Sequence, residues 1–303
     1  MQNTVLNSKV FVRIVILNYN ESDFTISLIE QLSHQSFKNF DIIVVDNNSV
    51  DLQKQKLRDG INKEVIIFSK SNLGYAAGNN LGLKYNDGKK VDYYLVLNND
   101  LIIEDDNFIL TLLDGMILKK DTGVVASSPL IDTISTNIPI ENQIQVRKLL
   151  PKFQTFLINI PIFKFITNRW LKREFLYMDD MPFLNKHLIC DSINGAAFII
   201  DASFIKVNNY LDEGTFLYYE ELLLGKQIQL VKKTCLLNGN TYVKHLQGVS
   251  SKSNTQNINI KMERFKYKSS LYYLNKYENL GWVGSKLYIL LSEFVIFLKK
   301  IKK

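Results

Sequence analysis

Apolar blocks alternate with mixed blocks along residues 10–130. The short apolar runs are bounded by polar residues and predict buried strands at 10–17, 41–45, 64–68, 92–97 and 123–127. Between them, apolar side chains recur at helical spacing and predict helices over 22–35, 50–59, 74–86 and about 106–119, with Ser22 or Asp23 capping the first. This alternation predicts an α/β fold with a mostly parallel central sheet flanked by helices.

The pattern changes after residue 131. Residues 132–190 have no clean period, and we interpret them as a variable insertion. Strand and helix patterns return over 191–245, followed by a predicted basic, aromatic helix at 261–280 and a last helix at 285–303. We therefore expect a main domain over residues 1–260 and a C-terminal helical region over residues 261–303.

Polar clusters follow three of the predicted strands, namely Asn18-Tyr19-Asn20, Asp46-Asn47-Asn48-Ser49 and Asn98-Asn99-Asp100. In parallel sheets, ligands gather at the carboxyl ends of strands. A carboxylate there can hold a divalent cation, and neighbouring amides can bond a sugar or ribose. The same residues can equally shape a turn or cap the next helix, and the sequence leaves both readings open.

A segment rich in small residues begins the helix predicted after the third strand. Gly74 and Gly78 permit close approach of the backbone, and a helix N-terminus favours an anion. The spacing matches neither a phosphate-binding P-loop nor a dinucleotide-binding loop, so this segment is weak evidence on its own.

The second half of the chain adds three candidate sites. Residues 191–198 form a polar turn that opens an apolar strand, and Glu220 and Glu221 follow an aromatic run. A carboxylate in a desolvated cleft can act as a base, whereas acids are also common at solvated helix starts. His245 can ligate a metal through a neutral imidazole or be an ordinary hydrogen-bonded residue.

Composition restricts the possible classes of protein only broadly. The chain has 303 residues, of which 46% are hydrophobic and 22% charged, and this composition excludes wholesale disorder. A net charge of +7 suits a polyanion, an anionic membrane or a ligand that bears phosphate. The two cysteines, Cys190 and Cys235, are too few for a disulfide framework, so reduced thiols in a cytosolic setting are expected. Neither a secretory signal nor a membrane-spanning helix is predicted.

The last predicted helix combines an apolar stripe with a basic end. The stripe consists of Leu287, Leu290, Leu291, Phe294, Leu298 and Ile301, and the end consists of Lys299, Lys300, Lys302 and Lys303. This pattern suits a helix lying in an anionic bilayer interface. A packed helix or a homodimerisation element with a solvated basic tail remains an alternative.

The order of the motifs is more specific than any one of them. Asn-Tyr-Asn, Val-Val-Asp-Asn-Asn-Ser, Asn-Leu-Gly-Tyr-Ala-Ala-Gly-Asn-Asn and Leu-Asn-Asn-Asp follow one another, and Asn-Gly-Ala-Ala-Phe, Phe-Leu-Tyr-Tyr-Glu-Glu and Val-Lys-His come later. This order resembles family 2 glycosyltransferases with the GT-A (Rossmann-like) fold, and most closely their bacterial rhamnosyltransferase-like and galactofuranosyltransferase-like branch. The resemblance spans residues 10–280 and implies that residues 1–260 are the catalytic domain.

The resemblance also implies roles for individual residues. The metal ligands would be Asp100 and His245, holding Mg²⁺ or Mn²⁺. Residues on the side of the acceptor or donor sugar would be Asn194, Gly195 and Tyr219. The nucleotide sugar would be bound by Asn18, Tyr19, Asn20, Asp46, Asn48, Asn72, Gly78, Asn98 and Asn99.

The implied reaction is a single displacement with inversion. A sugar would move from a UDP- or dTDP-sugar to a hydroxyl of a glycan or lipid-linked saccharide, with Glu221 or its neighbour Glu220 as the base. The implied setting is synthesis of a cell-surface polysaccharide, such as capsule or O-antigen, by a peripheral protein at the cytoplasmic face of a bacterial membrane.

Two departures from the family pattern leave other functions open. Residues 98–100 contain a single carboxylate, and the base position holds Glu rather than Asp. A catalytically degenerate nucleotide-binding protein is therefore one alternative. A nucleotidyltransferase is disfavoured because the first loop reads Asn-Tyr-Asn-Glu rather than basic, and nucleic-acid binding is disfavoured because no such module is recognised.

Overall fold

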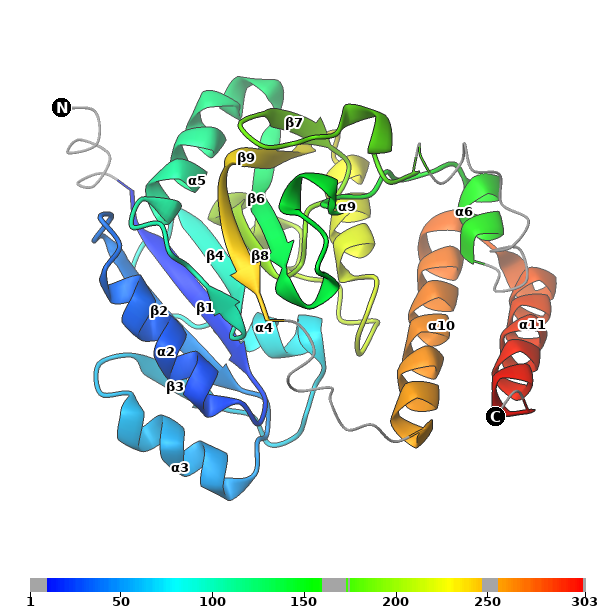
Figure 1. Ribbon diagram of the computed structural model, residues 1–303, viewed down its shortest axis with the longest axis horizontal. Helices are drawn as coiled ribbons and strands as arrows, with labels where there is room; N and C mark the ends of the chain where they lie inside the picture. Colours follow the sequence, from blue (N-terminus) through cyan, green and yellow to red (C-terminus); the bar gives the residue numbers. More distant parts are fainter. Residues whose placement is uncertain (1–9, 160–172, 174, 247–255, 302–303) are drawn as a thin grey trace.

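The computed structural model describes residues 10–159, 173, 175–246 and 256–301. It has an α/β fold in which helices cover a central sheet, as the sequence predicted (Figure 1). The helices α10 (Gln256–Glu278) and α11 (Gly281–Ile301) stand side by side at the end of the molecule opposite α2 (Ser22–Ser33) and α3 (Asp51–Gly60).

The first part of the sheet is parallel. It contains β1 (Val12–Asn18), β2 (Phe40–Asp46), β3 (Val65–Phe68) and β4 (Tyr93–Asn98), in the order β3-β2-β1-β4. The connecting helices are α2, α3 and α4 (Tyr75–Leu83), so all the elements expected here are present within a few residues of their predicted bounds. The predicted cap of α2 is wrong, because Ser22 lies inside the helix and its hydroxyl donates to the carbonyl oxygen of Gln53.

The second part of the sheet contains strands of both directions. β8 (Ala197–Asp201) runs antiparallel to both β4 and β6 (Val124–Thr133), and therefore β6 has the direction of β4. β9 (Thr234–His245) pairs in parallel with β6, while the short β5 (Leu101–Ile102) and β7 (His187–Cys190) pair antiparallel with β9. The sheet is thus mostly parallel, as predicted, but its sequence order is broken by a strand contributed late in the chain.

Side chains that alternate along the strands fill two separate cores. Ile14, Ile16 and Val44 face one core together with α2 and α5 (Phe108–Leu118). Val15 and Ile43 face the other core, which also contains buried residues of α4, α8 (Ala202–Val207) and α9 (Glu220–Leu230). Burial on both faces explains the continuous apolar runs read from the sequence. Cys190 and Cys235 are free and buried in the second core.

The region predicted to be a variable insertion contains little regular structure. Its described residues include 3-10 helices at Ile134–Thr136, Ile140–Asn142 and Met178–Asp180, the helix α6 (Lys152–Asn159) and the short strand β7. Gln143 and Gln145 fasten it to β6 by accepting hydrogen bonds from the backbone nitrogens of Thr133 and Ile131, each at 2.7 Å. Residues 160–172 and 174 of this region lie outside the described residues.

The C-terminal helical region begins earlier than predicted, at Gln256. α10 and α11 share a small core that contains Tyr267, Leu274, Tyr288 and Ile296, and α6 packs against α10. The sequence predicted no membrane-spanning helix, but α11 is long enough and apolar enough to cross a bilayer. Only 17% of its most apolar stretch is buried, so α11 is an exposed apolar helix rather than a core helix.

Candidate active site

The carboxyl ends of β1, β2 and β4 meet at one edge of the sheet. Asn18 lies opposite Asp46 in the β1–β2 pairing, and Leu17 lies opposite Asn98 in the β1–β4 pairing. The three polar clusters predicted from the sequence are therefore neighbours in space. The start of the reversed β8 reaches the same edge, because Ala197 lies opposite Leu97.

A network of enclosed hydrogen bonds fixes this edge. Asn18 Nδ2 donates to Asp46 Oδ1 at 2.9 Å, and Asn18 Oδ1 accepts from Thr25 Oγ1 at 2.9 Å and from Asn99 Nδ2 at 3.2 Å. Ser49 donates its backbone N–H to Asp46 Oδ2 at 3.1 Å. Asn18 and Asp46 are wholly buried, and buried polar groups are stabilising only when they are hydrogen-bonded. Their side chains therefore hold the strand ends in register.

The more accessible residues of this edge are Tyr19, Asn20 and Asn48. Tyr19 is 45% exposed, and Asn48 is also exposed. Asn20 and Asn48 adopt left-handed backbone conformations with φ of 60° and 66°, which Asn tolerates better than most residues. Asn20 Oδ1 accepts the backbone N–H of Val50 at 2.8 Å, so the two loops support each other.

Gly74 and Gly78 are in contact with protein rather than facing an open space. Gly74 has a φ of +82°, and a side chain there would collide with the carbonyl oxygen of Phe216. Gly78 is buried, and a Cβ there would lie 2.7 Å from Leu17 Cδ1. The small residues thus permit α4 to approach β1 and the loop before α9.

Asp100 and His245 are brought together by the short strand β5. Leu101 lies opposite His245 in the β5–β9 pairing, and His245 Nε2 lies 3.1 Å from Asp100 Oδ1. Burial and the nearby negative charges of Asp100 and Asp23 raise the pKa of Glu21, so this part of the edge suits a cation. Residues 247–255, which follow β9 in the chain, lie outside the described residues.

A carboxylate and an imidazole are both ligands that Mn²⁺ accepts, and they fit the predicted metal site. Within residues 10–159, 173, 175–246 and 256–301, the side chains of His, Cys, Asp and Glu form no group of three that could hold a metal. A metal held by Asp100 and His245 would therefore take its remaining ligands from a substrate or from water.

Glu220 and Glu221 begin α9 and lie beside Gly195. A Cβ at Gly195 would lie 3.4 Å from the Cγ atoms of both glutamates, so a larger residue would crowd the pair. Tyr75 and Gly195 line the same small cavity as the two glutamates, and the Tyr75 hydroxyl donates to the carbonyl oxygen of Gly195. The backbone N–H of Asn98 donates to the carbonyl oxygen of Ala196 at 2.8 Å, which joins this cavity to the strand-end clusters.

The two glutamates differ in environment. Glu220 Oε2 is enclosed and has no hydrogen-bond partner among the described residues. Burial, followed by the charge of Glu221, raises the pKa of Glu220 to about 8. Glu221 is 23% exposed, and its Oε1 lies 3.9 Å from Arg147 Nη1. Among the described residues, Glu221 is therefore the member of the pair whose carboxylate contacts a cation, whereas Glu220 has an enclosed oxygen.

Two residues predicted to lie near the sugars have structural contacts. Asn194 Oδ1 accepts the backbone N–H of Ala196 at 3.0 Å and so shapes the turn before β8. The ring of Tyr219 lies 5.8 Å from that of Tyr273 on α10. Tyr219 therefore faces the C-terminal helices.

A sequence model of glycosyl transferase family 2 matches residues 13–189, which is more than half of the chain. This chain belongs to glycosyl transferase family 2. The match includes all three strand-end clusters and ends before the Glu220–Glu221 pair. The family predicted from the order of the motifs is confirmed, whereas the rhamnosyltransferase-like and galactofuranosyltransferase-like branch stays a prediction.

Curated relatives are also glycosyltransferases, but they align only in part. The chain is 34% identical over 94 residues to an amylovoran biosynthesis glycosyltransferase of Erwinia amylovora, covering 29% of this chain and 30% of that protein. It is 32% identical over 113 residues to an uncharacterized glycosyltransferase of Rickettsia bellii, covering 33% of this chain and 16% of the relative. The chain therefore spans less than a third of the length of these relatives.

Solved structures of glycosyltransferases share the fold. A mannosyltransferase of Pyrobaculum calidifontis in complex with GDP-Man and Mn²⁺ superposes with a TM-score of 0.54 at 9% identity, over 93% of this chain and 74% of that one. GalNAc-T7 with UDP, GalNAc and Mn²⁺ gives a TM-score of 0.55 at 14% identity, over 78% and 44%. These likenesses confirm the predicted GT-A fold.

Two residues of this family 2 member lie in the site but were not predicted from the sequence, namely Asn47 and Arg147. Asn47 is buried, and its Nδ2 donates to Asn72 Oδ1 and to the carbonyl oxygen of Gly74, each at 3.0 Å. In the sequence, a role for Asn47 was indicated only by its position between Asp46 and Asn48. Arg147 approaches Glu221 from the irregular region, where no periodicity could place it.

Proposed function

We propose that this protein is an inverting glycosyltransferase that moves a sugar from a UDP- or dTDP-sugar to a hydroxyl of a glycan or lipid-linked saccharide. The observation that carries the proposal is the environment of Glu221, a partly exposed carboxylate beside Arg147 at the sheet edge where the strand-end clusters meet. Membership of family 2 and the GT-A fold support the same reaction.

The donor would lie along the ends of β1, β2 and β4. Tyr19, Asn20 and Asn48 are the accessible residues that would contact the nucleoside, with Asn72 near the ribose or diphosphate. The other proposed donor-binding residues are enclosed or partly enclosed and would order this surface from beneath, namely Asn18, Asp46, Gly78, Asn98 and Asn99.

Asp100 and His245 would hold a divalent cation, Mg²⁺ or Mn²⁺. When bound, this cation would neutralise negative charge on the diphosphate of the donor. The short distance between the two side chains supports their joint role, and the enclosed network around Asn99 would keep Asp100 at the edge of the sheet.

Glu221 would act on the acceptor. Its carboxylate would take the proton of an acceptor hydroxyl as that oxygen attacks the anomeric carbon, and the nucleoside diphosphate would leave from the opposite face. Glu220 would remain protonated at neutral pH because of its raised pKa, and it is therefore a poor candidate for the base. Gly195 would line the cavity beside the two glutamates, and Asn194 would fix the turn that carries it. Tyr219 would support the sugar-binding side indirectly, through its packing on Tyr273.

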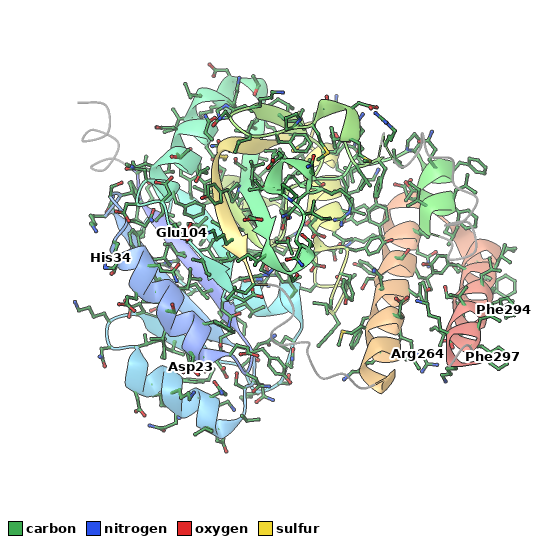
Figure 2. The ribbon with its side chains drawn as sticks, in the orientation of Figure 1. Asp23, His34, Glu104, Arg264, Phe294 and Phe297 are labelled. Carbon is green, nitrogen blue, oxygen red and sulfur yellow. The ribbon has the colours of Figure 1, made fainter. Side chains whose placement is uncertain are left out.

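We also propose that α11 attaches the protein to the cytoplasmic face of an anionic bacterial membrane, where a lipid-linked acceptor for capsule or O-antigen synthesis would lie. Phe294 and Phe297 are 50% and 55% exposed, and Figure 2 shows them on the side of α11 that faces away from α10. Lys299 and Lys300 follow at the end of the helix. Exposed apolar side chains next to lysines support a helix that lies in the membrane interface. The alternative is that a second copy of the chain packs against this face of α11.

The variants Glu221→Gln and Asp100→Ala test the assigned roles. Each should lower the rate of nucleoside diphosphate release in the presence of acceptor by about a hundredfold or more, because general-base catalysis alone contributes about that factor. Thermal shift should show that Glu221→Gln still binds UDP or dTDP with Mn²⁺, whereas Asp100→Ala should lose the part of the shift that depends on Mn²⁺.

Asp121→Asn is the matched control, because Asp121 is an exposed carboxylate outside the site. Its rate should equal that of the wild type. Full activity in both site variants would contradict the assigned roles. Nucleotide binding by a wild type that transfers no sugar would instead favour the catalytically degenerate alternative.

A further inference from the structure

We propose that Asp212 is a positioning residue that clamps the loop before α9 against α10 and thereby orients Glu221. The inference rests on the proposed role of Glu221 as the base. It assigns a catalytic purpose to the C-terminal helical region, which the sequence indicated only as a membrane or dimer contact.

Asp212 accepts three hydrogen bonds from side chains of α10 at the contact between the loop and that helix. Its side chain is 4% exposed and accepts hydrogen bonds from Tyr272 Oη at 2.8 Å, Lys276 Nζ at 2.7 Å and Tyr277 Oη at 2.9 Å. Although burial opposes ionisation, these three donors lower the pKa of Asp212. Hydrogen bonds to a charged acceptor are stronger than neutral ones, so this cluster joins the two segments firmly.

The rest of the loop follows α10 toward the glutamates. The ring of Phe216 stacks on that of Phe265 with 4.7 Å between the ring centroids. Ser269 Oγ donates to the carbonyl oxygen of Leu217 at 2.7 Å. Together with the packing of Tyr219 on α10, these contacts fix both the backbone and the side chains of the loop.

The loop is also attached to α4. Glu213 Oε1 accepts from Asn80 Nδ2 at 2.7 Å and from Lys84 Nζ at 2.9 Å. The backbone N–H of Tyr75 donates to the carbonyl oxygen of Phe216 at 2.9 Å. Adjacent acidic residues thus connect the loop to two helices from different parts of the chain.

The loop ends in an unfavourable backbone conformation next to the glutamates. Tyr218 and Tyr219 have φ values of 71° and 74°, which bulky residues rarely adopt. Such conformations persist only where surrounding contacts impose them, and they are common at functional sites. An independent ion pair of 3.0 Å between Lys226 of α9 and Glu278 holds the end of α10 against α9 itself. The orientation of Glu221 therefore depends on the packing of α10 against α9 and the loop before it.

Asp212→Asn tests the proposal because it removes the charge while keeping the size of the side chain. We expect kcat to fall about tenfold or more with an unchanged KM for the donor, because small misplacements of a reacting group can slow catalysis strongly. Amide hydrogen exchange should become faster over residues 215–223 in the variant. Tyr272→Phe and Tyr277→Phe each remove one hydroxyl donor and should give smaller changes in kcat and exchange in the same direction. If Asp212→Asn does not fold, these two variants test whether Asp212 positions the loop.

Arg264→Gln is the matched control on α10, because Arg264 pairs with Glu293 of α11 at 3.1 Å. It should leave both kcat and exchange over residues 215–223 at wild-type values. Wild-type kcat and wild-type exchange in Asp212→Asn would overturn the proposal. If the wild type transfers no sugar, the proposed function fails, and the exchange measurement still decides whether Asp212 holds the loop.

Discussion

Glu220 and Glu221 are adjacent at the start of α9, yet their carboxylates differ, because Glu220 Oε2 is enclosed while Glu221 Oε1 lies 3.9 Å from Arg147 Nη1. The sequence predicted a functional pair, because two carboxylates after an aromatic run match the family pattern. It could not choose between them, because burial of Glu220 Oε2 depends on the cavity formed with Tyr75 and Gly195, far away in the chain. The same limit applies to Asn18, whose polar character was predicted but whose complete enclosure was not.

The raised pKa of Glu220 predicts how stability depends on pH. The folded state keeps its proton up to about pH 8, whereas the unfolded chain releases it near the ordinary value of 4.5. The unfolded state therefore binds fewer protons in this interval, and the contribution of Glu220 to stability decreases as the pH rises from 4.5 to 8. The charges of Glu221 and Arg147 also affect this pKa, and a substitution of Glu220 leaves both residues in place.

Glu220→Gln removes this ionisable group while keeping a similar shape. We expect the variant to gain about 1–3 kcal/mol relative to the wild type at pH 9, and much less at pH 5. Urea unfolding at both pH values measures the difference. An equal difference at the two pH values would show that Glu220 ionises normally in the folded protein.

At the scale of elements, α10 and α11 lie next to each other but meet different surroundings. α10 packs on α9 and its preceding loop, where Tyr272 donates to Asp212 and Tyr273 is buried. α11 instead exposes Phe294, Phe297 and several other apolar residues (Figure 2). Both helices were predicted from the sequence, but α10 begins at Gln256 and α11 at Gly281, earlier than the predicted starts at 261 and 285. The sequence could not show which face is covered, because that depends on the contact of α10 with the loop before α9.

The exposed face of α11 predicts binding to anionic vesicles. The wild type should sediment with vesicles of phosphatidylglycerol and phosphatidylcholine more strongly than with phosphatidylcholine alone. Lys299→Glu combined with Lys300→Glu should weaken that binding about tenfold or more, because each lysine near an anionic surface contributes about 1 kcal/mol. Lys119→Glu combined with Lys120→Glu, at the end of α5, changes the charge equally and should have little effect.

Equal binding to both kinds of vesicle would contradict an electrostatic contribution from this helix end. Absence of binding to either, with a doubled mass in solution, would assign the apolar face of α11 to a second copy of the chain.

At the scale of the whole molecule, the proposed site joins two halves that are separate in sequence. The ends of the parallel strands were predictable because each strand is short, apolar and followed at once by polar residues. The position of β8 between β4 and β6 was not predictable, because nothing local in residues 197–201 specifies its partners. Because β8 lies between β4 and β6, Gly195 and α9 reach the edge of the sheet where β1, β2 and β4 end.

The most direct test of the central claim follows nucleotide sugars by proton NMR with wild-type protein and Mn²⁺, using water as the acceptor. The account predicts that a UDP- or dTDP-sugar is consumed, that the first sugar released has the opposite anomeric configuration to the donor, and that Glu221→Gln slows this release. Release of the sugar with retained configuration, or consumption of no member of either nucleotide class, would contradict it.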